Sequence, residues 1–250
     1  AGRNEIGVGM HIVGGSRTPV ILVPVAALVC GIVAGFAVSG WSSVVVYEGF
    51  GFLAAAAIVG ATLWHRPTPM WPWMLFAAGI ACSAFGDLLW DLTGLVEHVP
   101  ACTSWLPNVA YLLAYPCFCA GAFGLLGHRA ARRDVLTLLE AVALAAAVWL
   151  ILWVQIVHRQ LADGSLGFWD WVPTVLYPPL DLVIIVMIWR LGRGHLRRFG
   201  PWRLLMDGFL VMFVADWLYA MFGIAGSTTV NALLNLGWIT AYGCVAAAAL

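Results

Sequence analysis

Apolar stretches long enough to cross a lipid bilayer recur along almost the whole chain. A transmembrane helix needs about 20 predominantly apolar residues, because the hydrocarbon core of a bilayer is about 30 Å thick. Only 10% of the 250 residues are charged, against about 25% in soluble domains. The pattern predicts an all-α, polytopic transmembrane helical bundle of about eight spans, at residues 20–41, 44–64, 71–93, 106–127, 135–157, 172–191, 203–223 and 231–250.

The distribution of arginine predicts the orientation of these spans. Eleven of the 12 basic residues, all arginine, lie in the N-terminal tail, in the loops after the second, fourth and sixth spans, or at the adjoining edges. The other side holds Arg159 alone, and it carries the acids Glu48, Asp91, Glu97, Asp163 and Asp170. Because basic loops stay on the cytoplasmic side, both termini are expected to be cytoplasmic, and the protein is expected in the cell (plasma) membrane.

Composition excludes several functions. The formal net charge is zero and no basic cluster is interleaved with aromatic residues, which argues against nucleic acid as a partner. The chain has no lysine, so it cannot form a retinal Schiff base. No histidine falls within a predicted span, and Cys117 and Cys119 point to opposite sides of a helix. We therefore predict no metal, no cofactor and no catalytic residues in this segment.

Two regions are expected. Residues 1–18 are polar and glycine-rich and form an N-terminal tail, and residues 19–250 form the transmembrane domain. The sequence stops in "GCVAAAAL" with no polar residue after the last span. This pattern is typical of a chain truncated before a cytoplasmic domain.

Asp87, Asp181 and Asp216 lie well inside predicted spans. An aspartate near the centre of a membrane helix costs about 2.5–3.5 kcal/mol. Each belongs to a polar and aromatic stripe at helical spacing, and a fourth stripe lies on 106–127. The stripes are Ser83, Asp87, Trp90 and Asp91; Asn108, Tyr111 and Tyr115; Tyr177 and Asp181; Asp216 and Tyr219. Lipid cannot satisfy these groups, so we expect the stripes to meet in a ligand pocket that opens on the outer side.

The same residues have a second interpretation. Aspartate–tyrosine and aspartate–asparagine hydrogen bonds can simply hold helices together. Three acids without a buried arginine, however, either share protons or need a cation. We expect Asp181 to hydrogen-bond a tyrosine or asparagine of 106–127. Separately, Gly31 and Gly35 give the first span a close-packing face, which serves either a homodimer or a contact within the chain.

Five segments, in this order, resemble one family. They are "GDLLWDL" (86–92), "LPNVAYLLAYP" (106–116), "LYPPLDLVII" (176–185), "FVADWLYAMFG" (213–223) and "LGWITAYGCVAAAAL" (236–250). They are similar to the membrane-embedded N-terminal sensory region of actinobacterial GGDEF/EAL (diguanylate cyclase/phosphodiesterase) signalling proteins. The resemblance covers about residues 50–250. The family usually has an acid where this chain has Asn108, which removes one negative charge.

The resemblance implies an integral-membrane sensor and anchor for cyclic-di-GMP signalling. Its output domain, and a homodimer contact through that domain, would lie outside these residues. On this hypothesis an unknown small ligand or a membrane state acts from the outer side. The alternative is a small-solute or proton-coupled membrane transporter, which would use the same carboxylates as a relay.

Overall fold

The computed structural model describes residues 18–37, 40–94, 105–131, 143, 146–151, 153–154, 168–193, 200–222 and 228–250. Every regular element within these ranges is a helix. The helices are α1 (Thr18–Ile32), continued by the π-helical turn η1 (Val33–Ala37), α2 (Trp41–His65), α3 (Trp71–Leu92), α4 (Trp105–Ala131), α7 (Phe168–Arg193), α8 (Gly200–Phe222) and α9 (Thr228–Ala249). The predicted all-helical fold is confirmed for the part of the chain that the structure describes.

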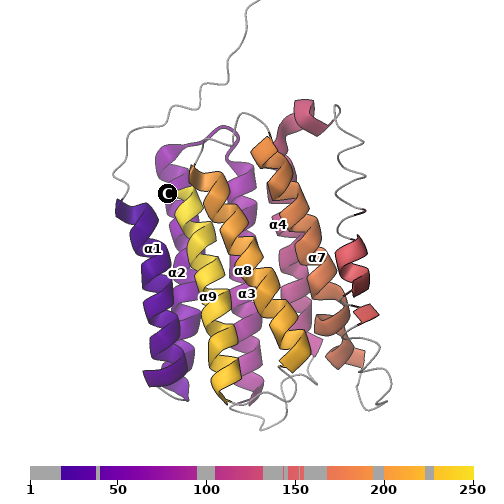
Figure 1. Cartoon of the computed structure of the whole chain (residues 1–250). Coiled ribbons are helices and arrows are strands. Elements are labelled where there is room, and N and C mark those ends of the chain that lie inside the picture. Colours follow the sequence, from indigo (N-terminus) through magenta and orange to yellow (C-terminus); the bar gives the residue numbers. More distant parts are fainter. Residues whose placement is uncertain are drawn as a thin grey trace, which may run out of the picture.

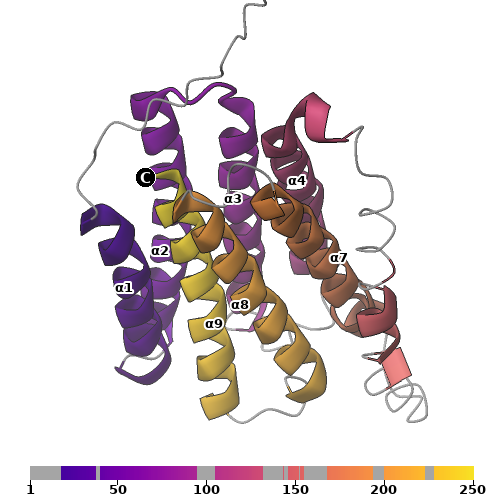
Figure 2. The ribbon, with the colours of Figure 1, turned by 45° about the horizontal axis from the view of Figure 1, so that its top comes forward.

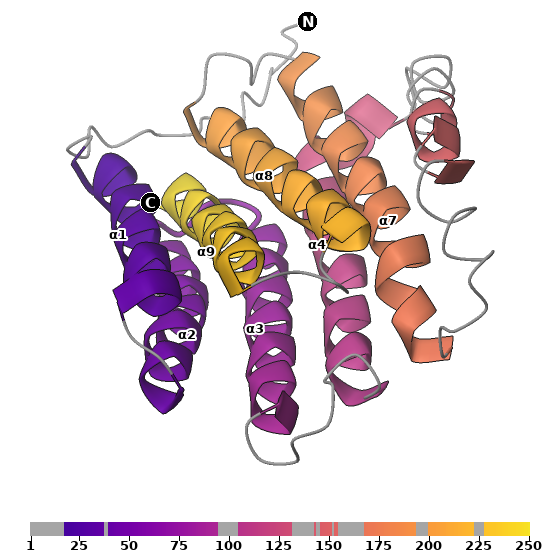
Figure 3. The ribbon, with the colours of Figure 1, turned by 60° about the horizontal axis from the view of Figure 1, so that its bottom comes forward.

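The helices form two layers (Figure 1). Helices α2, α3 and α4 make one layer, and α1, α9, α8 and α7 make the other. Contacts between α4 and α7 close one edge, and contacts of α2 with α9, α1 and η1 close the other. The tilted views show α9 and α8 lying over α3 (Figures 2 and 3). Polar groups on the inner faces of both layers are therefore brought together.

Within the described residues, six helices are long and apolar enough to cross a membrane: α2, α3, α4, α7, α8 and α9. The chain is thus a multi-pass membrane protein. The predicted first span is shorter than expected, since α1 has 15 residues before η1. The predicted fifth span, 135–157, lies mostly outside the described residues, so the count of eight stays a prediction. Helices α4 and α7 run in the same direction (Figure 1), so the chain between them has to return across the membrane, as the predicted fifth span would.

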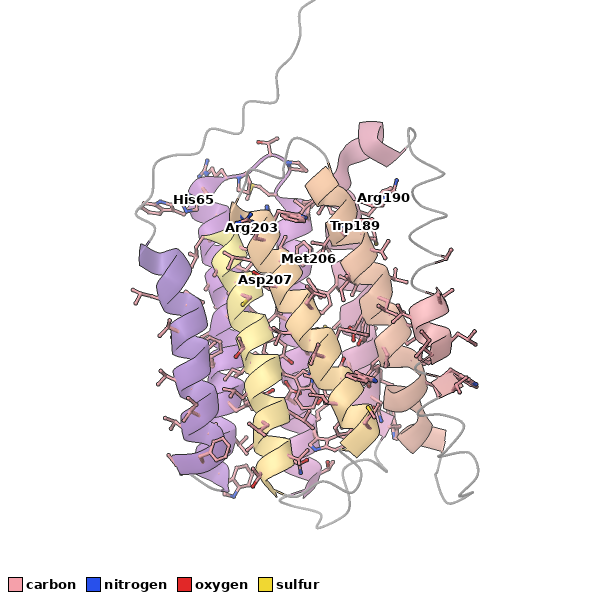
Figure 4. All side chains as sticks on the ribbon, viewed as in Figure 1. His65, Trp189, Arg190, Arg203, Met206 and Asp207 are labelled. Carbon is pink, nitrogen blue, oxygen red and sulfur yellow. The ribbon has the colours of Figure 1, made fainter. Side chains whose placement is uncertain are left out.

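One end of the bundle carries the basic side chains that the structure describes. His65, Arg190 and Arg203 are spread across that end (Figure 4), and we call it the basic end. Helix α2 stops at this end because Arg66 adopts a left-handed conformation, and α3 restarts with a proline in its first turn, where proline fits best. The grouping agrees with the arginine pattern of the sequence. Which side of the membrane this end faces stays a prediction.

The half of the bundle toward the basic end is filled by apolar side chains. Phe76, Phe118 and Phe209 meet there from α3, α4 and α8, with ring centroids 5.1–6.3 Å apart. All three are almost completely buried. The outer surface instead exposes large apolar side chains, such as Val45 and Leu53, as a surface facing lipid does. In the interior, the clustered polar side chains lie in the other half, away from the basic end.

Candidate functional site

A cluster of acids and aromatic residues occupies the half of the bundle away from the basic end. We define the acid–aromatic cluster as the predicted site residues together with two residues of α9 that join them. Its members are Asp87, Trp90, Asp91, Asn108, Tyr111, Tyr115, Tyr177, Asp181, Asp216, Tyr219, Trp238 and Tyr242. The structure brings the predicted stripes of α3, α4, α7 and α8 together, and α9 contributes a fifth.

Asp87 joins three helices. The Tyr111 hydroxyl donates to its Oδ1 at 2.7 Å, and the Tyr242 hydroxyl donates to its Oδ2 at 2.8 Å. Gly86 makes the first contact feasible, because a Cβ at this position would lie 2.6 Å from the Tyr111 ring. The glycine lets the ring of Tyr111 lie against α3, so that its hydroxyl reaches the next residue of that helix.

Asp216 joins a second set of helices. Trp238 Nε1 on α9 donates to Oδ1 of Asp216 at 2.6 Å, and the Tyr115 hydroxyl on α4 donates to its Oδ2 at 3.4 Å. Hydrogen bonds to a carboxylate are stronger than those between neutral groups. Both Asp87 and Asp216 therefore link helices from the two layers, and each receives two donors.

Asp181 differs from the other two aspartates. Its side chain is 0% exposed, and neither carboxylate oxygen has a hydrogen-bond partner among the described residues. Its polar neighbours are Asp216 on α8 and Tyr115 on α4. Tyr115 is the α4 neighbour that the sequence predicted for Asp181, and it interacts with this carboxyl group, although its hydroxyl donates to Asp216. Asn108, the other predicted partner, accepts instead from the Tyr177 hydroxyl, at 2.8 Å. One turn of α7 thus presents a satisfied tyrosine and an unsatisfied acid.

Aromatic rings connect these polar groups. Tyr177 packs against Tyr111 and Tyr115, with centroids 6.0 and 5.7 Å apart. Tyr219 packs against Trp90 and Trp238, at 6.2 and 5.9 Å. The two groups bring α3, α4, α7, α8 and α9 into one cluster. Such rings fix the positions of the hydroxyl and indole donors around the acids.

Two further acids, Asp91 and Glu48, lie on the α2 side of the cluster. Asp91 is half-buried near the end of α3. Glu48, which the sequence placed on the side opposite the arginines, lies within α2, and its side chain is 4% exposed. Glu48 interacts electrostatically with Asp87 and Asp91. The acids therefore extend from α3 to α2 within the same layer of helices.

Sequence reasoning missed three residues: Glu48, Trp238 and Tyr242. Trp238 and Tyr242 are four residues apart, the spacing that places side chains on one helix face, and this signal was available within "LGWITAY". The predicted span began at residue 44, which put Glu48 near its end, where a side chain can reach water, so its burial was not expected. Because α2 begins at Trp41, Glu48 lies about two helical turns from the start of the helix.

The charge balance of the site is acidic. Where side chains are described, the basic residues are His65, Arg66, Arg190 and Arg203, and Figure 4 shows three of them at the basic end. No group of three histidine, cysteine, aspartate or glutamate residues in the described ranges is arranged to hold a metal ion. The arrangement therefore suits protons or an organic cation better than a metal.

Gly31 faces the inside of the bundle. A Cβ there would lie 2.6 Å from Leu236 and 2.7 Å from Ile239, both on α9. This geometry favours the interpretation of Gly31 as a contact within the chain. The surroundings of Gly35, the other residue of the proposed seam, lie outside the described side chains.

No protein-family model, no curated protein and no solved structure matches the chain. The resemblance to the membrane regions of GGDEF/EAL proteins therefore stays a prediction.

Proposed function

We propose that this chain is the membrane-embedded sensor and anchor of a plasma-membrane, actinobacterial cyclic-di-GMP signalling protein. The acid–aromatic cluster responds to a ligand or membrane state from the outer side, and the helices transmit the response to a cytoplasmic output. The segment itself catalyses nothing in this proposal. The observation that carries it is Asp181, a fully buried acid with no hydrogen bond to any described residue.

An acid in this environment is a source of bistability. Burying a polar group without a partner costs about 1–3 kcal/mol in proteins, and a charged one more. A bound cation, an added proton or a small shift of α7 relieves this cost. A ligand shifts an equilibrium between two helix arrangements by the difference in its affinity for them. Asp181 supplies such a difference, because a proton, a cation or a new contact made by a shift of α7 stabilises one helix arrangement more than the other.

The cluster is mechanically connected to the basic end. Asp181 lies on α7, and α7 is fastened to α8 nearer the basic end by the Trp202 indole, which donates to the Ile188 carbonyl at 2.6 Å. Gly192 leaves room for this indole, since a Cβ there would overlap it. A displacement of α7 at Asp181 is therefore transmitted to α8 through this contact, near the end that we expect to be cytoplasmic.

A transporter is the second candidate. It would use Asp87, Asp181 and Asp216 as a relay, and it needs access to the site from both faces of the membrane. Phe76, Phe118 and Phe209 fill the half toward the basic end and are at most 1% exposed. This packing favours the sensor.

The test compares Asp181→Asn with Asp181→Leu in the full-length protein. Asparagine keeps the shape of the side chain but cannot carry charge, so D181N should fold with an unchanged melting temperature and alter cyclic-di-GMP output. Asp207→Asn, an exposed carboxylate near the basic end, is the matched control and should change neither quantity. If D181N leaves output at the wild-type level while D181L lowers the melting temperature, Asp181 only packs helices, and the sensor proposal fails.

A flux assay separates the transporter. Wild-type protein in liposomes with an entrapped pH-sensitive dye should show no proton movement above that of empty liposomes when a pH gradient is imposed. Proton flux that disappears in D181N would favour the transporter over the sensor.

A further inference from the structure

Glu48 is a buried acid that the proposed sensor does not use. Its side chain is 4% exposed, and among the residues described neither carboxylate oxygen has a hydrogen-bond partner. The adjacent Tyr47 hydroxyl is also buried and has no partner in the described part of the chain. Two unsatisfied polar side chains in succession on α2 face the same acids of α3, since both interact with Asp87 and Asp91.

The surroundings of Glu48 are acidic on every packed side. Helix α2 contacts α3, α9, α1 and η1. The titratable groups that face Glu48 are Asp87 and Asp91 on α3, Tyr242 on α9 and Tyr47 on α2 itself. Among the described side chains of α1 and η1 the titratable one is Cys30. None of these groups supplies a positive charge.

Glu48 and Asp87 therefore form a pair with unequal environments. Asp87 receives two hydroxyl donors, at 2.7 and 2.8 Å, so the protein solvates a negative charge on it. Glu48 receives no donor from the described residues. The pair Asp181 and Asp216 shows the same division: Asp216 receives two donors and Asp181 none. The same unequal supply of hydrogen-bond donors thus occurs twice in the bundle.

We propose that the Glu48–Asp87 pair is a proton-binding site in which Glu48 carries the proton and Asp87 the negative charge. An ionised glutamate, desolvated beside two further acids and without a counter-ion, is strongly unfavourable, whereas a neutral carboxylic acid is tolerated. A metal ion fits poorly, because no three possible ligands in the described ranges converge on one point. Both Asp87 oxygens are also already engaged by tyrosine hydroxyls.

Transfer within the pair moves charge between helices. Because neither Glu48 oxygen has a hydrogen-bond partner among the described residues, this transfer requires a shift of α2 against α3 that brings a Glu48 oxygen to Asp87. The O–H bond of Glu48 then breaks, an O–H bond forms on a carboxylate oxygen of Asp87, and the negative charge passes from α3 to α2. The Tyr111 or Tyr242 hydroxyl then loses its ionised acceptor, which weakens the link of α3 to α4 or α9. Proton binding at this site thereby changes helix contacts, and this holds for a sensor and for a transporter alike.

Infrared spectroscopy of the purified chain in lipid nanodiscs tests the proposal. A protonated carboxylic acid without a hydrogen bond gives a carbonyl stretching band distinct from that of a carboxylate. We expect this band in the wild type at neutral pH and its loss, in part, in Glu48→Gln. Asp207→Asn should retain the full band. Full wild-type intensity in E48Q would overturn the proposal.

Two further measurements keep the proposal testable if E48Q does not fold. Glu48→Leu should fold with wild-type stability at neutral pH, since an apolar side chain of similar size replaces a neutral one. A melting temperature far below that of the wild type, in both E48L and E48Q, would show that an ionised Glu48 is needed. Replacing choline chloride by sodium chloride at constant ionic strength should leave the carbonyl band unchanged. If the band disappears in sodium chloride, the site binds a metal cation, and the proposal that Glu48 carries a proton is overturned.

The sign of the pH dependence follows from the same assignment. The folded chain holds a proton on Glu48 that the unfolded chain releases above about pH 4.3. Stability should therefore fall as pH rises, and E48L should show a flatter dependence of melting temperature on pH than the wild type. An unchanged slope in E48L would contradict the proposal. Cyclic-di-GMP output plays no part in these measurements, so the proton site and the proposed function can fail separately.

Discussion

At the scale of single residues, identical carboxyl groups have different roles because their donors differ. Asp87 and Asp216 each accept two side-chain hydrogen bonds from other helices, which makes them structural links. Asp181 and Glu48 are more deeply buried and accept none from the described residues. Asp87 and Asp216 thus fit the predicted role of holding helices together, whereas Asp181 and Glu48 are the acids to which we assign a functional role as a proposal.

The role of Gly86 can be tested by a substitution that adds one methyl group. A Cβ at this position would lie 2.6–3.0 Å from the Tyr111 ring, so Gly86→Ala should displace the ring and weaken its bond to Asp87. We expect a loss of about 1–3 kcal/mol, as for other overpacked sites, measured as a lower melting temperature in detergent. Gly60→Ala is the matched control, because no atom lies within 4 Å of a Cβ there. Equal stability of the two variants would show that the contact is not needed.

At the scale of the helices, the bundle divides into two halves with different interactions. Toward the basic end, aromatic packing of Phe76, Phe118 and Phe209 joins α3, α4 and α8. Away from it, hydrogen bonds between polar side chains join all of α3, α4, α7, α8 and α9. Small residues such as Gly51 and Ala84 allow α2 and α3 to approach closely, as is usual where lipid provides no hydrophobic drive for helix association.

The phenylalanine cluster should dominate stability at this scale. Phe209→Ala removes a side chain that is 0% exposed, and truncating a buried phenylalanine typically costs about 3–5 kcal/mol. Phe85→Ala is the matched control, since Phe85 is 49% exposed on the lipid-facing surface. Thermal unfolding in one detergent should show a large drop for F209A and a small one for F85A. Similar drops would mean that the described packing does not hold the bundle together.

At the scale of the whole molecule, the two layers turn a linear pattern of stripes into one site. Helices α3 and α4 lie in one layer and α7, α8 and α9 in the other, so each hydrogen bond of Asp87 to Tyr242 or of Asp216 to Tyr115 crosses between layers. The cluster lies in one half and the described basic side chains gather at the end of the other half. The molecule is therefore electrically polar along its long axis.

This polarity predicts the topology. If the basic end is cytoplasmic, a cysteine at Ser42, exposed near the start of α2, should react with a membrane-impermeant maleimide on intact cells. A cysteine at Thr68, exposed in the loop between α2 and α3, should react only after the cells are opened. Both variants are made in a background without native cysteines. The reverse labelling pattern would overturn the predicted orientation.

The sequence alone determined the class of fold and the main residues of the site. Long apolar segments in a chain of few charges leave membrane helices as the stable solution, because backbone polar groups in lipid have to be satisfied internally. Helical spacing of Asp87 with Trp90, and of Tyr177 with Asp181, placed those residues on shared faces. Acids in such faces cannot turn toward lipid, so their meeting inside the bundle followed from solvation alone.

Only the tertiary structure decided which donor serves which acid. Hydrogen-bond pairing depends on distances across helices, and no period along one helix encodes the offset between two of them. Asn108 therefore pairs with Tyr177 rather than with Asp181, and α9 supplies Trp238 and Tyr242 from the far end of the chain. The burial of Glu48 likewise depends on how closely α2 packs on α3. That distance is set by Gly51 on α2, which lies against Ala84 on α3.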